Sequence, residues 1–131
     1  SFENKIKSIA GDVYGKDLGT GNVEGSSSLV VIWADGTSGP KNGCFRAYGC
    51  NNYFEDVATS VENVFRDPDF YDSLIEPKTS DKRYIQKLSL LNEYNFLPKG
   101  WLETRMNKVG YSRKCINLVT KKDGYKARCI N

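Results

Sequence analysis

The feature that most constrains the fold of this 131-residue chain is its set of four cysteines, Cys44, Cys50, Cys115 and Cys129. An even number of cysteines is typical of two disulfides, and four cysteines allow three pairings. The alternatives are four reduced, buried thiols or a metal site. Neither cysteine spacing matches a usual zinc pattern, and the chain contains no histidine that could assist. We therefore expect two disulfides, no metal and no cofactor.

The segment that carries the first two cysteines is predicted to be extended. Residues 29–34 form an apolar run, and four of its six residues are β-branched or aromatic, which suits a buried strand. Residues 44–50 are expected to form the second strand of a hairpin, around a long loop at 35–43. An extended 44–50 segment would hold its two cysteines about 20 Å apart, too far to bond to each other. Each would then reach one of the two later cysteines and fasten the hairpin to the C-terminal segment.

A strongly periodic helix is expected over residues 53–65. Asn52 suits the N-cap position, and Asp67-Pro68 is expected to end the helix, because the residue before proline disfavours helical backbone. One stripe of this helix is apolar and should pack on the hairpin; its members are Tyr53, Phe54, Val57, Ala58, Val61, Val64 and Phe65.

Other helices are expected before and after this one. Ser1 should cap a short helix that ends at Gly11, ahead of a glycine-rich loop over residues 11–28. Apolar spacing also predicts a turn or short helix at 70–75 and an amphipathic helix that begins near Asp81. The apolar face of that second helix comprises Tyr84, Ile85, Leu88, Leu91 and Tyr94. Its polar side comprises Lys82, Arg83 and Lys87.

The C-terminal region contains the clearest hairpin signal of the sequence. Residues 114–120 and 125–130 flank Asp123-Gly124, a pair that supplies positive φ for a tight turn. Residues 101–109 fit a strand or a helix equally well. The sequence therefore predicts an α+β fold in a single domain over residues 1–131. We expect an antiparallel sheet of about four to five strands with two to three helices packed on it, braced by two disulfides.

The absence of histidine excludes several kinds of chemistry. Ser-His-Asp hydrolysis, Cys-His catalysis and nucleases that use a histidine base all require an imidazole. Carboxylate pairs remain as candidates for a small hydrolase, in particular Glu55, Glu62, Asp67 and Asp69. The acidic residues Asp67, Asp69, Asp72 and Glu76 could bind calcium or form a solvated surface. The sequence lacks the EF-hand loop pattern, and this favours the solvated surface. We predict no catalytic residue.

The charges are unevenly distributed along the chain. Residues 1–80 carry a net charge of −5, and residues 81–131 carry +8. This asymmetry predicts either a basic binding face or two halves that neutralise each other when folded. The candidate binding residues are Lys114, Lys121, Lys122, Tyr125, Lys126 and Arg128. An alternative is a nucleic-acid or polyanion site in which aromatic side chains stack on bases, the candidates being Tyr84, Trp101, Tyr111 and Tyr125.

In general character, the chain is similar to small secreted effectors and toxins of fungi, because it combines four cysteines and a loop-rich body with no set of catalytic residues. We therefore expect a secreted, monomeric binding protein with no membrane span, acting as an effector or toxin on a host or competitor protein. The basic C-terminal residues and the 35–43 loop are its expected contact surfaces, because binding residues concentrate on loops held by a rigid scaffold.

Overall fold

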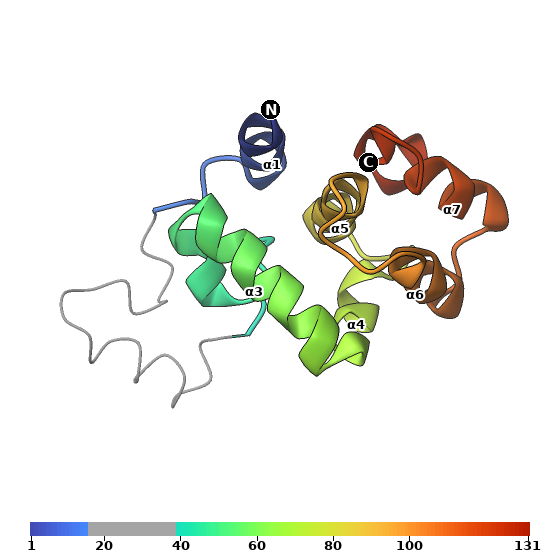
Figure 1. The fold of residues 1–131 in the computed structure, drawn as a ribbon, viewed down its shortest axis with the longest axis horizontal. Helices are drawn as coiled ribbons and strands as arrows, with labels where there is room; N and C mark the ends of the chain where they lie inside the picture. Colours follow the sequence, from blue (N-terminus) through green and yellow to red (C-terminus); the bar gives the residue numbers. More distant parts are fainter. Residues whose placement is uncertain (16–38) are drawn as a thin grey trace.

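The computed structural model describes residues 1–15 and 39–131, and most of these residues are helical. Its α-helices are α1 (Phe2–Ala10), α3 (Tyr53–Arg66), α4 (Asp72–Ile75), α5 (Arg83–Glu93), α6 (Trp101–Val109) and α7 (Arg113–Val119) (Figure 1). Four short 3₁₀ helices join them: η1 (Ala47–Asn51), η2 (Pro68–Tyr71), η3 (Gly124–Lys126) and η4 (Arg128–Ile130). The described part contains no strand, so the predicted α+β fold with a four- to five-stranded sheet is wrong there. The predicted strand at 29–34 lies outside the described residues.

Helix α5 occupies the centre of the fold. It contacts α1, α4, α6 and the C-terminal η3 turn. Its Ile85, Leu88 and Leu91 side chains are buried, as the apolar spacing predicts, whereas Tyr94 lies beyond the helix end and is exposed. The core continues through Phe45, Tyr71, Leu102, Met106, Ile116 and Val119. These buried side chains form one connected core over the described residues.

The predicted helix ends are largely confirmed. The Ser1 side chain accepts a hydrogen bond from the Asn4 amide at the start of α1, and Gly11 ends that helix at φ 73°. The Asn52 side chain accepts a hydrogen bond from the Glu55 amide at 2.9 Å, and α3 ends before Asp67-Pro68. Residues 101–109, which fit either structure, form helix α6. Side-chain caps therefore fix the start of α1 and of α3, as predicted.

Helix α3 turns a mostly polar face inward, and Val64 is the one buried member of the predicted apolar stripe. Its buried residues are mostly polar, namely Asp56, Thr59, Ser60, Asn63 and Val64. Phe54 and Phe65, from the predicted core stripe, are 66% and 71% exposed. The polar face is buried because η1 approaches it closely and because its side chains find partners there, such as Arg46, which donates to Asn63 at 2.8 Å. The predicted packing of the stripe on a hairpin is therefore wrong.

The predicted C-terminal hairpin is also wrong. Residues 113–119 form helix α7, whose Ser112 N-cap accepts a hydrogen bond from the Cys115 amide at 3.1 Å. Asp123 does adopt positive φ, as the Asp-Gly signal predicts, but it leads into the η3 turn. Gly124 lies so close to α7 that a Cβ atom there would be 1.9 Å from the carbonyl oxygen of Val119. The turn therefore folds back onto α7 instead of pairing two strands.

Both disulfides are present, but their pairing is local. Cys44 bonds to Cys50, and Cys115 bonds to Cys129. The predicted cross-links between the two regions are wrong because residues 44–50 are not extended: the chain curls into η1, and the two Cα atoms are 5.8 Å apart. Each disulfide therefore closes a short loop. The first braces the segment beside α3, and the second fastens the C-terminal turns to α7.

Candidate functional site

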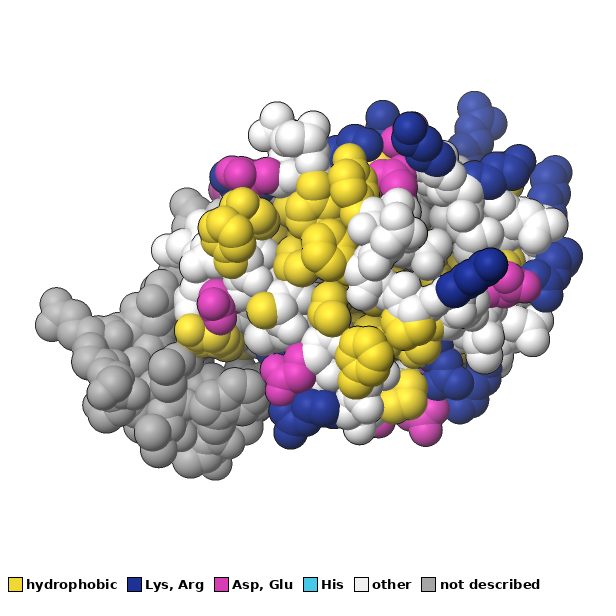
Figure 2. Space-filling model, in the orientation of Figure 1, with side chains coloured by type: hydrophobic (Ala, Val, Ile, Leu, Met, Phe, Trp, Pro, Cys, Tyr) yellow, Lys and Arg dark blue, Asp and Glu magenta, His cyan; other side chains and the backbone are white. Residues whose placement is uncertain are grey.

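The five cations that the sequence predicts as binding residues lie on the segment from α7 to the C-terminus. We call this set the basic end; its members are Lys114, Lys121, Lys122, Lys126 and Arg128, and all five are exposed. Figure 2 shows dark-blue side chains gathered over this part of the molecule, where Figure 1 places α7 and the C-terminus. Tyr125 is half-buried beside them, and its ring centroid lies 5.6 Å from the Lys126 ammonium.

The basic end differs from the other cations of the C-terminal half in its electrostatic partners. Within the described residues, none of its five members forms an ion pair. In contrast, most of the remaining cations after residue 81 contact a carboxylate: these are Arg83, Lys87, Arg105, Lys108 and Arg113. The positive charge left for a partner is therefore concentrated at one place.

The predicted acidic cluster supplies part of this neutralisation. Asp69 and Asp72 face helix α6, and Asp69 accepts hydrogen bonds from Arg105 at 2.8 Å and Lys108 at 3.0 Å. These cations lower the pKa of Asp69, Lys108 having the larger effect. The two halves of the chain thus neutralise each other here, and these two carboxylates are engaged by side-chain cations.

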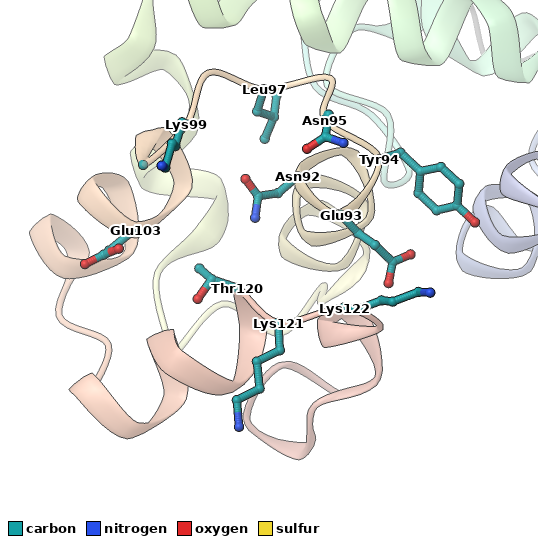
Figure 3. A pocket seen from close by; sticks show the side chains of 11 residues that line it. Asn92, Glu93, Tyr94, Asn95, Leu97, Lys99, Glu103, Thr120, Lys121 and Lys122 are labelled. Carbon is teal, nitrogen blue, oxygen red and sulfur yellow. The ribbon is translucent and has the colours of Figure 1, made fainter.

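A groove of about 870 Å³ with a mixed polar and apolar lining lies next to the basic end (Figure 3). The end of α5, the 95–100 connection, the start of α6 and the residues after α7 enclose it. Lys99, Lys121 and Lys122 line it together with neutral polar groups, the Asn92 and Asn95 amides and the Thr120 hydroxyl. The groove therefore offers cations and both donors and acceptors of hydrogen bonds.

Two carboxylates also line the groove, but neither belongs to the predicted hydrolase set. Glu93 is only 5% exposed; Lys5 lies 3.5 Å away, and the Asp123 amide donates a hydrogen bond to it. Glu103 pairs with Arg113 at 2.9 Å. The predicted candidates Glu55, Glu62, Asp67 and Asp69 do not line this groove. Both groove carboxylates thus already have cationic partners, which does not favour general acid-base work.

The predicted stacking platform is not assembled. Tyr84 and Tyr111 are buried in the core, where Tyr84 accepts a hydrogen bond from Gly43 and Tyr111 donates one to Ile75. The Trp101 ring packs edge-on against Tyr71 at 5.2 Å. Of the four aromatic candidates, only Tyr125 lies beside the basic end. A site that stacks successive bases requires several such faces in one row.

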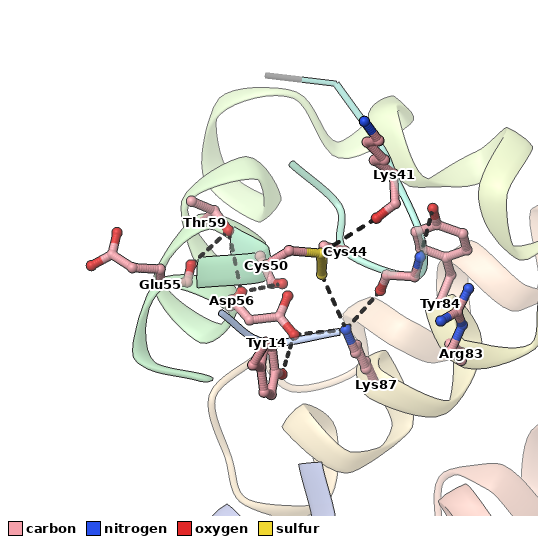
Figure 4. The surroundings of a disulfide bond; sticks show 12 residues. Tyr14, Lys41, Cys44, Cys50, Glu55, Asp56, Thr59, Arg83, Tyr84 and Lys87 are labelled. Carbon is pink, nitrogen blue, oxygen red and sulfur yellow. Dashed lines mark hydrogen bonds and ion pairs between the residues drawn. A yellow bond between two sulfur atoms is a disulfide. The ribbon is translucent and has the colours of Figure 1, made fainter. Parts of the chain in front are cut away.

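Sequence reasoning missed a buried ionic cluster between α3 and α5 (Figure 4). Lys87 was expected on the polar side of α5, but its side chain is only 1% exposed and lies 2.7 Å from the fully buried Asp56 carboxylate. The Lys87 ammonium also donates to the Gly43 carbonyl at 2.7 Å, and Tyr14 donates to Asp56 at 2.5 Å. Burial lowers the pKa of Lys87, and Asp56 opposes that shift. A usable signal was the position of Lys87 beside Leu88 and between Tyr84 and Leu91.

This cluster is linked to the first disulfide. Lys87 bonds to the carbonyl of Gly43, the residue before Cys44, and its nitrogen lies 3.9 Å from the Cys44 sulfur. Gly43 has φ 84°, a left-handed backbone conformation that favours glycine at this position. The ion pair therefore anchors the disulfide loop to α5. It is closed to solvent, which assigns it a structural role.

Comparison with known proteins identifies no relative: no protein-family model, curated protein or solved structure matches the chain. In the part that the structure describes, no helix is long and apolar enough to span a membrane. The same residues contain no group of three or more acidic or cysteine side chains placed to hold a metal ion.

Proposed function

We propose that this chain is a secreted, disulfide-stabilised protein that acts by binding the acidic surface of another protein through its basic end. One observation carries the proposal: the five cations of the basic end are exposed and have no ion-pair partner among the described residues. In contrast, most other cations after residue 81 are paired with a carboxylate. An effector or toxin role, as expected from the sequence, would use this surface to engage its target.

The groove beside the basic end supports a protein partner over a nucleic acid. Its lysines alternate with amides and a hydroxyl, which can pair with backbone and side-chain groups of a polypeptide. The aromatic rings that a single-stranded nucleic acid would need are mostly in the core. A heparin-like polyanion remains the second candidate, because exposed cations alone attract any dense negative charge.

Neutralising part of the basic end tests this proposal. The variant is Lys121→Gln with Lys122→Gln and Lys126→Gln, and poly-L-glutamate serves as the probe for an acidic polypeptide surface. Exposed charge pairs contribute about 0.2–1 kcal/mol each, so the loss of three contacts should weaken binding about 3- to 150-fold and reduce its salt dependence.

The matched control removes three positive charges elsewhere, with Lys7→Gln, Lys78→Gln and Lys108→Gln, and should bind like the wild type. Equal weakening by both variants would show that net charge alone governs binding, and no weakening by either would remove the basic end from consideration. Tighter binding to heparin than to poly-L-glutamate, with the same dependence on the three lysines, would favour the polyanion candidate.

Secretion is tested through the cysteines of protein taken from its native source. Alkylation before reduction should label no cysteine, and alkylation after reduction should label all four, since disulfides persist in oxidising compartments. Four reactive thiols in the native protein would contradict an extracellular location.

A further inference from the structure

The proposed function leaves the exposed face of α3 unused. Four apolar residues on it follow one another at helical spacing and form what we call the α3 stripe: Phe54, Ala58, Val61 and Phe65. The two phenylalanines are 66% and 71% exposed, the highest values among the large hydrophobic side chains of the described residues. Figure 2 shows hydrophobic atoms open on the near face along the course that α3 takes in Figure 1.

We propose that the α3 stripe is the contact surface between two copies of this chain, with the two α3 helices antiparallel. The order of residues supports a two-fold contact: large rings stand at both ends, and small side chains stand between them. In an antiparallel pair, Phe54 of each copy faces Phe65 of the other, and Ala58 faces Val61. An isologous interface requires such self-complementarity, because the same patch serves both subunits.

The charges on one side of the stripe are complementary in the same arrangement. Glu55, Glu62 and Arg66 follow that side, and the antiparallel alignment brings Arg66 of one copy next to Glu55 of the other. Arg66 already contacts Glu62 of its own helix. Each end of the interface thus gains an acidic partner for its arginine, whereas a parallel two-fold pair would set this charged side against the Val57 and Val64 side of the other copy.

The area available indicates a weak dimer. A phenylalanine buries roughly 150–250 Å² when fully covered, so the exposed parts of two rings from each copy provide roughly 400–700 Å² of apolar contact. With the flanking side chains, the interface would reach the lower end of the range for specific complexes, about 1,200 Å². We therefore expect a concentration-dependent equilibrium, in place of the monomer predicted from the sequence.

Sedimentation equilibrium over a wide concentration range tests the inference on the intact, oxidised protein. The average mass should rise from 14.7 kDa towards twice that value. Phe54→Glu with Phe65→Glu should abolish the rise, and Leu118→Glu, which changes an exposed apolar residue on α7, should leave it intact. A wild-type protein that stays monomeric at every concentration, or a dimer that persists in the Phe54→Glu/Phe65→Glu variant, would overturn the inference.

Ala58→Trp separates specific pairing from general stickiness. It enlarges the apolar surface but blocks close approach at the centre of the stripe, so it should weaken the dimer at least tenfold. Stronger association of this variant would contradict the antiparallel contact. Glu55→Arg and Arg66→Glu should each weaken the dimer, and the two together should restore it. This test is independent of the proposed function, because the stripe and the basic end lie on different helices.

Discussion

Replacing Lys87 with methionine tests how the structure is held together. The change removes the ammonium group and keeps a side chain of similar length on the buried face of α5. The Asp56 carboxylate is 0% exposed and would lose its cationic partner. Among the described residues, the Tyr14 hydroxyl would remain as its side-chain hydrogen-bond donor. The change also leaves the Gly43 carbonyl without the hydrogen bond that Lys87 donates.

The expected cost is large because an unpaired buried charge is among the most unfavourable groups in a protein. Removing one partner of a buried ion pair typically costs about 3–5 kcal/mol. For a chain of this length, each kcal/mol corresponds to a shift of roughly 3–4 °C in the melting temperature. Lys87→Met should therefore lower the melting temperature by about 10–20 °C.

Denaturant and thermal unfolding, followed by circular dichroism, measure this effect with two comparisons. Glu62→Gln, which breaks the exposed pair with Arg66, should change the free energy of unfolding by at most about 0.5 kcal/mol. Combining Lys87→Met with Asp56→Leu removes both charges and should recover part of the loss. A cost below about 1 kcal/mol for Lys87→Met, or a double variant as unstable as the sum of its single changes, would refute the reasoning.

Three further predictions concern the disulfides, a buried tyrosine and a close contact. Reductant should open Cys115–Cys129 before Cys44–Cys50, because Cys129 is exposed and both cysteines of the other bond are fully buried. Mass mapping of labelled thiols would show the order of reduction, and the opposite order would be inconsistent with this burial. Burial raises the pKa of Tyr111 to about 12. An unfolded tyrosine titrates near pH 10, so the stabilisation that depends on a neutral Tyr111 is complete below about pH 10 and is lost as pH rises towards 12. Tyr111→Phe should reduce that alkaline loss of stability in denaturant titrations, and an unchanged pH profile would contradict it. Gly124→Ala should destabilise the protein by more than about 1 kcal/mol in thermal unfolding, because its Cβ would overlap the backbone of α7, and a neutral effect would show that the C-terminal turns can move.

The sequence predicts those parts of the fold that depend on neighbouring residues. Ser1, Asn52 and Pro68 fix helix ends because a cap or a proline acts on amides within one turn. The Asp-Gly signal correctly predicts positive φ at Asp123. The exposure of the lysines in the candidate site is also predictable, because lysine side chains are rarely buried unless they have a partner.

The errors arise where distant partners decide the outcome. Helix α3 buries its polar face because Lys87 on α5 pairs with Asp56, and the periodicity of α3 alone contains no information about that partner. The disulfide pairing follows from the curled backbone of residues 44–50, whose apolar alternation equally suits a strand. Residues 113–119 combine helical spacing of Cys115, Ile116 and Val119 with strand-like composition, and packing against the core favours the helix.

The claim that a partner contacts the basic end is tested most directly by lysine labelling. Acetylation of the protein, alone and with saturating poly-L-glutamate, is quantified residue by residue by mass spectrometry. The account predicts protection of Lys114, Lys121, Lys122 and Lys126, with Lys7 and Lys78 labelled equally in both states. Uniform protection of all lysines, or protection that avoids these four, would contradict it.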